Sequence, residues 1–156
     1  MTSKRYFISA CLLGQKVRYD GKDCLVKELL ESLVPNQYIS LCPEIAGGLS
    51  TPRPPAEIQS GSGSDVLKHE VCVIDAVGTN VSFAFIEGAY QALKLAQDFQ
   101  ATHAILKAKS PSCGSGMIYD GSFSGNKISG DGVTAALFKQ YGMVVMTEIE
   151  FLETLK

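Results

Sequence analysis

Long apolar runs are missing from this sequence, and so is an excess of charge of either sign. No uninterrupted apolar stretch approaches the roughly 20 residues that a membrane-spanning helix needs. The apolar stretch near the N-terminus is broken at Ser9 and Gly14, which leaves it too short for the core of a signal peptide. With 14 basic and 16 acidic residues, the chain has no sequence-wide positive field for duplex nucleic acid. We expect a cytoplasmic protein that binds a small molecule and neither a membrane nor duplex nucleic acid.

The cysteine pattern also lacks two familiar arrangements. The five cysteines are odd in number and too scattered for the disulfide framework of a small secreted domain; they stand at positions 11, 24, 42, 72 and 113. No two of them form a Cys-x-x-Cys pair, so a structural zinc ribbon is a poor match. In a reducing compartment such residues are free thiols or metal ligands.

What the chain does have is apolar content for one core and a regular alternation of elements. Its 156 residues, 46% of them hydrophobic, suit a single domain over 1–156. Strands are expected at 5–10, 37–42, 71–75, 104–108 and 143–146, and helices at 23–34, 81–99, 131–141 and 148–155, with a long irregular passage at 44–69. This alternation predicts an α/β fold, a three-layer sandwich with a mostly parallel, Rossmann-like sheet and helices on both faces.

Three of the cysteines come at the end of a predicted strand or just past it. Cys11, Cys42 and Cys113 are each followed by a residue that breaks regular structure: Gly14 after a short spacer, Pro43 and Gly114. Because ligands of parallel sheets bind beyond the carboxyl ends of strands, these thiols are expected at one edge, where a soft metal or a metal–sulfur cluster would be held. The alternative is three unrelated buried thiols. Cys24 and Cys72 lack such a context, and core packing is the better account of Cys72.

Two further residues near these cysteines have side chains suited to catalysis. Glu44 lies two residues after Cys42, and Ser110 three before Cys113. A carboxylate beside a metal site can activate water, and a hydroxyl can hold a substrate heteroatom. The alternative is that Ser110 caps a turn ahead of Pro111 and that Glu44 faces solvent.

Other polar features fit less well into one site. The two histidines, His69 and His103, are expected at the surface, although a Cys113–His103 hydrolase dyad stays possible. Arg53 stands among prolines, where it either binds an anionic group or lies in an exposed structural loop. The glycine-rich stretch 61–65 is expected to be flexible, and the sequence does not reveal whether it closes over the site. Tyr-Asp-Gly occurs at 19–21 and again at 119–121, and both copies are interpreted as turns.

These blocks together resemble one bacterial family. The resemblance is carried by residues 9–14, 17–21, 42–49, 51–58, 106–107, 110–114, 118–123 and 130–134. They are similar to the thiouracil desulfidase family, long catalogued as a domain of unknown function, and the match covers almost the whole chain. Cys24 and the run Asn80-Val-Ser82, where Asp-Val-Thr is more familiar, depart from the family pattern.

The resemblance implies a [4Fe-4S] cluster held by Cys11, Cys42 and Cys113, with one iron left open. It further implies Glu44 as catalytic acid or base and Ser110 as the active-site serine. The implied reaction removes sulfur from a thiolated nucleobase such as 2-thiouracil, a hydrolytic exchange of C=S for C=O in which the sulfur is captured on the unligated iron. A non-catalytic iron–sulfur or sulfur-transfer protein is the alternative, and a metal-independent cysteine hydrolase the third. Exposed iron is labile, so a chain prepared in air is expected to lose the cluster.

Overall fold

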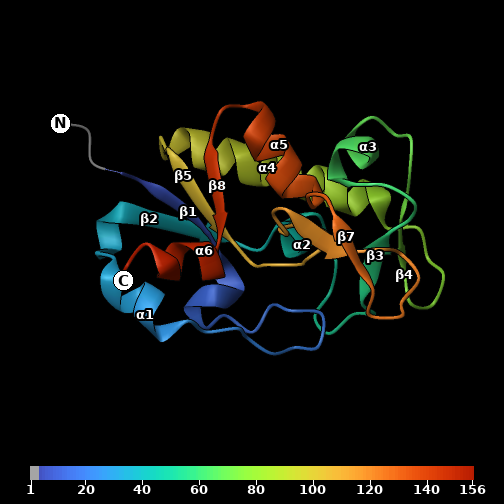
Figure 1. Cartoon of the computed structure of the whole chain (residues 1–156), viewed down its shortest axis with the longest axis horizontal. Helices are drawn as coiled ribbons and strands as arrows, with labels where there is room; N and C mark the ends of the chain where they lie inside the picture. The colour runs from blue at the N-terminus through green and yellow to red at the C-terminus, as the bar shows by residue number, and fades with distance from the viewer. Residues whose placement is uncertain (1–3) are drawn as a thin grey trace.

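The centre of the protein is a four-stranded parallel sheet, seen in a computed structural model that describes residues 4–156 (Figure 1). The strand order is β2 (Tyr38–Leu41), β1 (Tyr6–Ser9), β5 (His103–Leu106) and β8 (Val144–Thr147). All three neighbouring pairs are parallel, with Phe7 opposite both Ile39 and Ala104. The sequence-based expectation of a mostly parallel sheet is confirmed.

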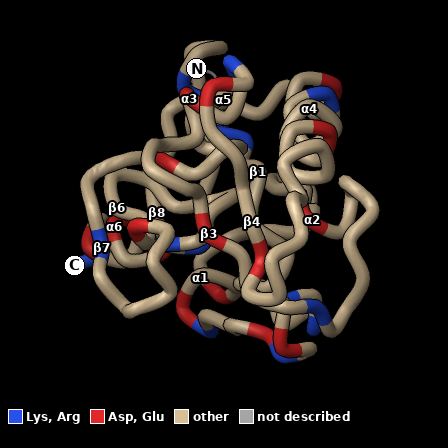
Figure 2. Tube along the Cα trace, turned by 90° about the vertical axis from the view of Figure 1, so that its right-hand side faces the viewer, with Lys and Arg blue, Asp and Glu red and all other residues tan. Residues whose placement is uncertain are grey.

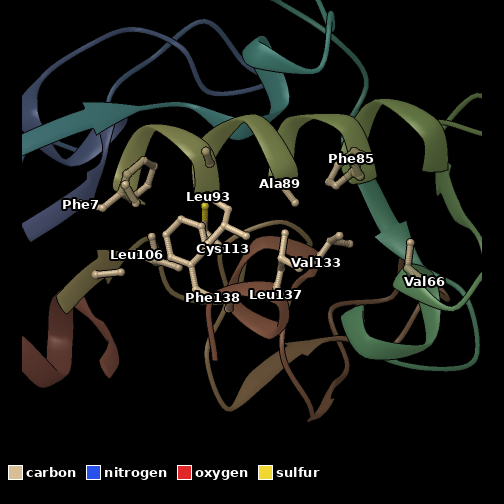
Figure 3. Close-up of a cluster of buried hydrophobic side chains, with 14 of the residues drawn as sticks. Phe7, Val66, Phe85, Ala89, Leu93, Leu106, Cys113, Val133, Leu137 and Phe138 are labelled. Atoms are coloured by element: carbon tan, nitrogen blue, oxygen red, sulfur yellow. The ribbon is translucent and has the colours of Figure 1, made fainter. Parts of the chain in front are cut away.

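Helices cover both faces of this sheet, as the alternation of elements predicts. One face carries α4 (Ser82–Asp98) and α5 (Val133–Gln140), and the other carries α1 (Lys27–Ser32) and α6 (Glu148–Glu153). Successive residues of a strand point to opposite faces. Phe7 accordingly packs edge-on against Phe138 of α5, with ring centroids 5.1 Å apart, whereas Tyr6 meets Phe151 of α6. The result is the three-layer α/β sandwich, with its larger core drawn in Figure 3.

Smaller elements lie beyond the carboxyl ends of the parallel strands. They are the short helices η1 (Ala10–Leu13), α2 (Pro43–Ala46) and α3 (Gly63–Leu67) and two antiparallel pairs, β3 (Ala56–Ile58) with β4 (Val73–Asp75) and β6 (Met117–Tyr119) with β7 (Lys127–Ser129). A further short helix, η2 (Pro35–Gln37), lies at the other end of the sheet, where it leads into the amino end of β2. The strand expected at 71–75 is therefore outside the main sheet: only Val73–Asp75 is extended, and it pairs with β3.

The passage 44–69 is also more ordered than its composition indicates. It contains most of α2 and all of β3 and α3. The stretch 61–65, expected to be flexible, instead leads into α3, where the Asp65 carboxylate accepts the backbone N–H of Ser62 at 2.9 Å and caps the helix. α3 packs against α5, and a Cβ atom at Gly63 would lie 2.2 Å from the carbonyl oxygen of Gly132.

Two helix boundaries differ from the sequence-based expectation. α1 begins only at Lys27, because the N–H groups of Cys24 and Val26 instead donate to carbonyls of η1. α5 has Gly132 as its N-cap, because the carboxylate of Asp131 pairs with Lys139 and accepts the Gly116 N–H. Tyr141, expected to point inward, is 57% exposed.

Charges of both signs are distributed over the molecule, with no face of one sign in the view of Figure 2. Within residues 4–156, no helix combines the length and apolar character needed to span a membrane.

Candidate active site

Three adjacent strands deliver the three cysteines to one cavity. Cys11 lies in η1 directly after β1, Cys42 follows β2 and is the N-cap of α2, and Cys113 ends the loop that follows β5. Within the sheet, the chain passes from β1 to β2, its neighbour on one side, and later to β5, its neighbour on the other side. The strand order therefore reverses at β1, and the cavity lies at this switch point of the sheet. All three residues line this cavity, whose volume is about 430 Å³. The sequence-based expectation that they share one edge matches this placement.

The loop before Cys113 is fixed by Ser110, which also lines the cavity. The Ser110 hydroxyl oxygen accepts the backbone N–H groups of Ser112 and Cys113 at 3.1 and 3.0 Å. Among the residues that the structure describes, this hydroxyl donates no hydrogen bond, so its proton is free for a ligand. Capping a turn and meeting a ligand are therefore compatible roles for Ser110.

Glu44 lines the same cavity and does not face solvent. Its side chain is 17% exposed, and its Oε1 lies 3.1 Å from Nε of Arg53, whose side chain is 6% exposed. Burial raises the pKa of Glu44, while the charge and hydrogen bond of Arg53 lower it. Arg53 also donates to the carbonyl oxygens of Val17 and Ser50 at 3.0 Å each. Arg53 is therefore not an exposed loop residue, and the anionic group that it binds in this structure is the Glu44 carboxylate.

Burial dominates the electrostatics of the three thiols. It raises the pKa of Cys113 to about 12, although hydrogen bonds from the Ser9 and Ser112 hydroxyls act in the opposite direction. Burial also raises the pKa of Cys11, and the nearby thiols add to the effect. For Cys42, burial raises the pKa and the backbone N–H of Ile45 lowers it. These thiols are protonated at neutral pH unless a cation takes them as thiolates.

The arrangement suits a cluster better than a single metal ion. Among residues 4–156, no three His, Cys, Asp or Glu side chains are grouped to hold one metal ion. A tetrahedral zinc ion with bonds of about 2.3 Å needs its ligand sulfurs roughly 3.8 Å apart. In a metal–sulfur cluster, by contrast, each thiolate binds a different iron, so the ligand sulfurs need not meet around one metal ion.

A partly buried ion pair at the cavity was not expected from the sequence. Lys107, which lines the cavity, places Nζ 3.2 Å from Oε2 of Glu148, and the other carboxylate oxygen accepts the Ala108 N–H at 2.7 Å. Glu148 thereby ties the start of α6 to the segment that leads to Cys113. Leu106 pairs with Thr147 at the ends of the neighbouring strands β5 and β8. Lys107 and Glu148 directly follow these two residues, so the ion pair could be predicted only if the order of the strands in the sheet were known.

Several residues considered from the sequence lie away from the cavity. His103 is the first residue of β5, so the strand itself, about 13 Å long, separates it from the end where the loop to Cys113 begins, and the Cys113–His103 dyad is wrong. His69 is exposed as expected. Cys72 is exposed, so its assignment to the core is wrong, because β4 starts only at Val73. Cys24 is half-buried and its N–H donates to the Cys11 carbonyl at 2.9 Å, but it is absent from the cavity lining, as is the stretch 61–65.

Comparison with known proteins gives three concordant findings. The model of the 2-thiouracil desulfurase family matches residues 7–150. An uncharacterized protein of Bacillus subtilis strain 168, YbbK, is 45% identical over 148 residues, which cover 95% of this chain and 98% of that protein. A solved structure of the [4Fe-4S]-dependent thiouracil desulfidase TudS aligns with a TM-score of 0.84 and 41% identity, covering 97% of this chain and 95% of that one.

The agreement extends over nearly the whole sequence and over the parallel sheet that carries the three cysteines. The family model matches residues 7–150, and both relatives are more than 40% identical at nearly full coverage. The chain belongs to the 2-thiouracil desulfurase family.

Proposed function

We propose that this protein is a [4Fe-4S]-dependent desulfidase that converts the C=S group of a thiolated nucleobase, such as 2-thiouracil, to C=O. The whole span 1–156 acts as one desulfidase domain. The observation that carries the proposal is the cavity at the switch point of the sheet, lined by three buried or half-buried cysteines, a carboxylate and a serine. Family membership and the 41% identity to a [4Fe-4S]-dependent thiouracil desulfidase support it.

The residues that would hold the cluster are Cys11, Cys42 and Cys113. Three protein thiolates leave one iron of a cubane cluster without a protein ligand. When bound, the cluster supplies a Lewis-acidic, sulfur-binding iron at the cavity. Arg53 and Lys107 line the same cavity. Their positive charges offset part of the negative charge that three thiolates and Glu44 bring to it.

Glu44 is the group that handles protons in this proposal. Its carboxylate, held by Arg53 at 3.1 Å, accepts a proton from a water molecule that attacks the thiocarbonyl carbon. The carbon exchanges sulfur for oxygen, and the sulfur leaves at the oxidation level of sulfide. The reaction consumes one water and moves no net electrons.

Ser110 orients the substrate in this proposal. The N–H groups of Ser112 and Cys113 fix its oxygen, so the hydroxyl group that donates the proton has a defined position at the cavity wall. It donates to a ring heteroatom of the substrate and holds the thiocarbonyl group toward the cysteines.

Anaerobic reconstitution with iron and sulfide, followed by measurement of sulfide release from 2-thiouracil, tests the function. We expect wild type to release sulfide and uracil in equal amounts, Glu44→Gln to lose at least about a hundredfold in kcat, and Ser110→Ala to lose at least about tenfold. Cys72→Ser, at an exposed thiol outside the cavity, is the matched control and should behave as wild type. Unchanged sulfide release in Glu44→Gln and Ser110→Ala that retain the cluster would favour a sulfur-transfer protein without these catalytic residues.

A further inference from the structure

The Tyr-Asp-Gly sequence that occurs twice in the chain forms two matching turns at the mouth of the same cavity. Tyr19 and Tyr119 both line it, although they are 100 positions apart in sequence. In each copy the aspartate accepts the backbone N–H two residues later, at 3.0 Å for Lys22 and 2.9 Å for Ser122. The proposed catalytic chemistry of Glu44, Ser110 and the cysteines uses neither tyrosine.

A single segment of chain ties the two turns together. The backbone N–H of Arg53 donates to the Tyr19 carbonyl at 2.7 Å, and four residues later the Glu57 carboxylate accepts the Gly121 N–H at 2.9 Å. Gly121 has a φ of +96°, and a Cβ atom there would lie 2.6 Å from the Ile58 carbonyl oxygen, so a side chain would push the turn away. The separation of the two tyrosines is therefore constrained by the segment 53–58, which is hydrogen-bonded to both turns.

Each tyrosine ring also has a cation near its face. The guanidinium carbon of Arg18 lies 5.5 Å from the ring centroid of Tyr19, and Nζ of Lys127 lies 5.5 Å from that of Tyr119. A cation over the electron-rich face of an aromatic ring restrains that ring. Among the described residues, neither tyrosine hydroxyl makes a hydrogen bond, and Tyr19 is 39% exposed. Two restrained aromatic rings with unburied surface at a cavity are suited to contact a flat ligand.

We propose that Tyr19 and Tyr119 recognise the substrate by stacking against its planar heteroaromatic ring. The substrate class is then a planar heterocyclic thione, and acyclic thioureas or thioamides are bound poorly. This inference rests on the proposed desulfidase function and identifies Tyr19 and Tyr119 as the residues that bind the ring of the substrate. Stacking of a base on an aromatic side chain has a strength that corresponds to a roughly tenfold change in affinity.

Nitration of tyrosines by tetranitromethane tests the proposal in the wild-type protein, with peptides read by mass spectrometry. The ligand is uracil at millimolar concentration, which has the ring but no sulfur, so ring binding is measured independently of desulfidation. We expect uracil to slow nitration of Tyr19 and Tyr119 severalfold and to leave Tyr90 and Tyr141 unchanged, which are 48% and 57% exposed. Equal nitration of Tyr19 and Tyr119 with and without uracil overturns the proposal.

Kinetics of the reconstituted enzyme supply the second test. Tyr19→Leu and Tyr119→Leu remove the aromatic ring and keep apolar bulk, whereas Tyr19→Phe and Tyr119→Phe keep the ring. We expect each leucine variant to raise KM for 2-thiouracil roughly tenfold, the phenylalanine variants to stay within about twofold of wild type, and KM for acyclic thiourea to change in none. Tyr90→Leu is the control. An unchanged KM for 2-thiouracil in leucine variants with wild-type cluster absorbance contradicts stacking.

Discussion

At the scale of single residues, the charge state of Glu44 depends on Arg53. Burial alone raises the pKa of the carboxyl, and the guanidinium 3.1 Å away acts against that shift. Arg53 itself donates hydrogen bonds to Val17, Ser50 and Thr51, so its position is fixed independently of Glu44. A pair this well buried is costly to break, because removing one partner leaves the other charge uncompensated.

Replacement of Arg53 should therefore destabilise the apoprotein. We expect Arg53→Met to lower the free energy of unfolding by about 3 kcal/mol, and the double variant Arg53→Met/Glu44→Gln to lose less than the two single losses combined. Urea denaturation measures both. Lys94→Met, which removes an exposed pair with Asp98, is the control and should change stability by less than about 0.5 kcal/mol. Strict additivity of the Arg53 and Glu44 effects would mean that the pair is not coupled.

Thiol reactivity should follow burial in the apoprotein. Burial raises the pKa of Cys11, Cys42 and Cys113, which keeps them protonated and unreactive, whereas Cys72 is exposed. We expect a maleimide at neutral pH to modify Cys72 first and Cys113 last, as resolved by peptide mass spectrometry over time. Modification of Cys113 at the rate of Cys72 would show that the cavity is open to solvent in a way that the structure excludes.

Single residues were predictable where local sequence decides their place. A cysteine just after a strand of a parallel sheet must lie at the carboxyl edge, and Cys11 and Cys42 follow this rule. Arg53 and Cys72 were not predictable: the partners of Arg53 come from three other parts of the chain, and Cys72 becomes exposed because β4 is shorter than its apolar pattern. The roles of the three cysteines as ligands stay a prediction.

At the scale of elements, the position of Cys42 and Glu44 depends on a close crossing of α2 over α4. A Cβ atom added at Gly88 would lie 1.8 Å from the Pro43 carbonyl oxygen, and one at Gly47 would lie 1.9 Å from the Ala84 carbonyl oxygen. Only glycine at both positions lets these two backbones approach. Because Cys42 caps α2 and Glu44 lies in its first turn, the crossing fixes both side chains.

Gly88→Ala should separate α2 from α4. The added methyl group meets backbone, which cannot move aside alone, so we expect a loss of roughly 3 kcal/mol in stability and a lower iron content after reconstitution. Thermal denaturation and iron analysis provide the two readouts. Gln91→Ala, at an exposed position of the same helix, is the control and should affect neither. A Gly88→Ala protein with wild-type stability and iron content would show that the crossing does not position the site.

Elements were predictable in proportion to their length and local pattern. α4 has 17 residues with a sustained helical pattern, and its bounds differ little from those expected. β3, β6 and β7 have three residues each and exist because they find partners elsewhere, which no local pattern reveals. β4 lies within the strand expected at 71–75, but its pairing with β3 outside the main sheet was not predictable. The helix α3 was missed because glycine and serine dominate a segment that its Asp65 cap and its packing on α5 order.

At the scale of the whole molecule, stability should depend on pH through His103. Burial, with a smaller contribution from Lys4, lowers the pKa of His103 below the ordinary histidine value of 6.5. The unfolded chain then binds a proton at higher pH than the folded protein does, so this contribution to stability is present above pH 6.5 and is lost as the pH falls through the folded pKa. Urea midpoints of the apoprotein between pH 7 and 5 should fall more steeply in wild type than in His103→Gln. Equal slopes would contradict the assignment.

Cluster binding should stabilise the fold as a whole, because its three proposed ligands follow the three strands β2, β1 and β5. A ligand that binds only the folded state raises its stability by mass action. We expect the thermal midpoint of the reconstituted protein to exceed that of the apoprotein by several degrees under anaerobic conditions. The difference should vanish in Cys113→Ala and persist in Cys72→Ser; an equal shift in both variants would argue against Cys113 as a ligand.

The most direct measurement of the central claim is the iron and acid-labile sulfide content per chain after anaerobic reconstitution. The account predicts about four of each in wild type and in the double variant Cys24→Ser/Cys72→Ser, because three thiols suffice. Single alanine substitutions of Cys11, Cys42 and Cys113 should each reduce both contents sharply. A double variant that fails to retain iron, or a Cys11, Cys42 or Cys113 variant that binds as much as wild type, would contradict a cluster held by these three cysteines.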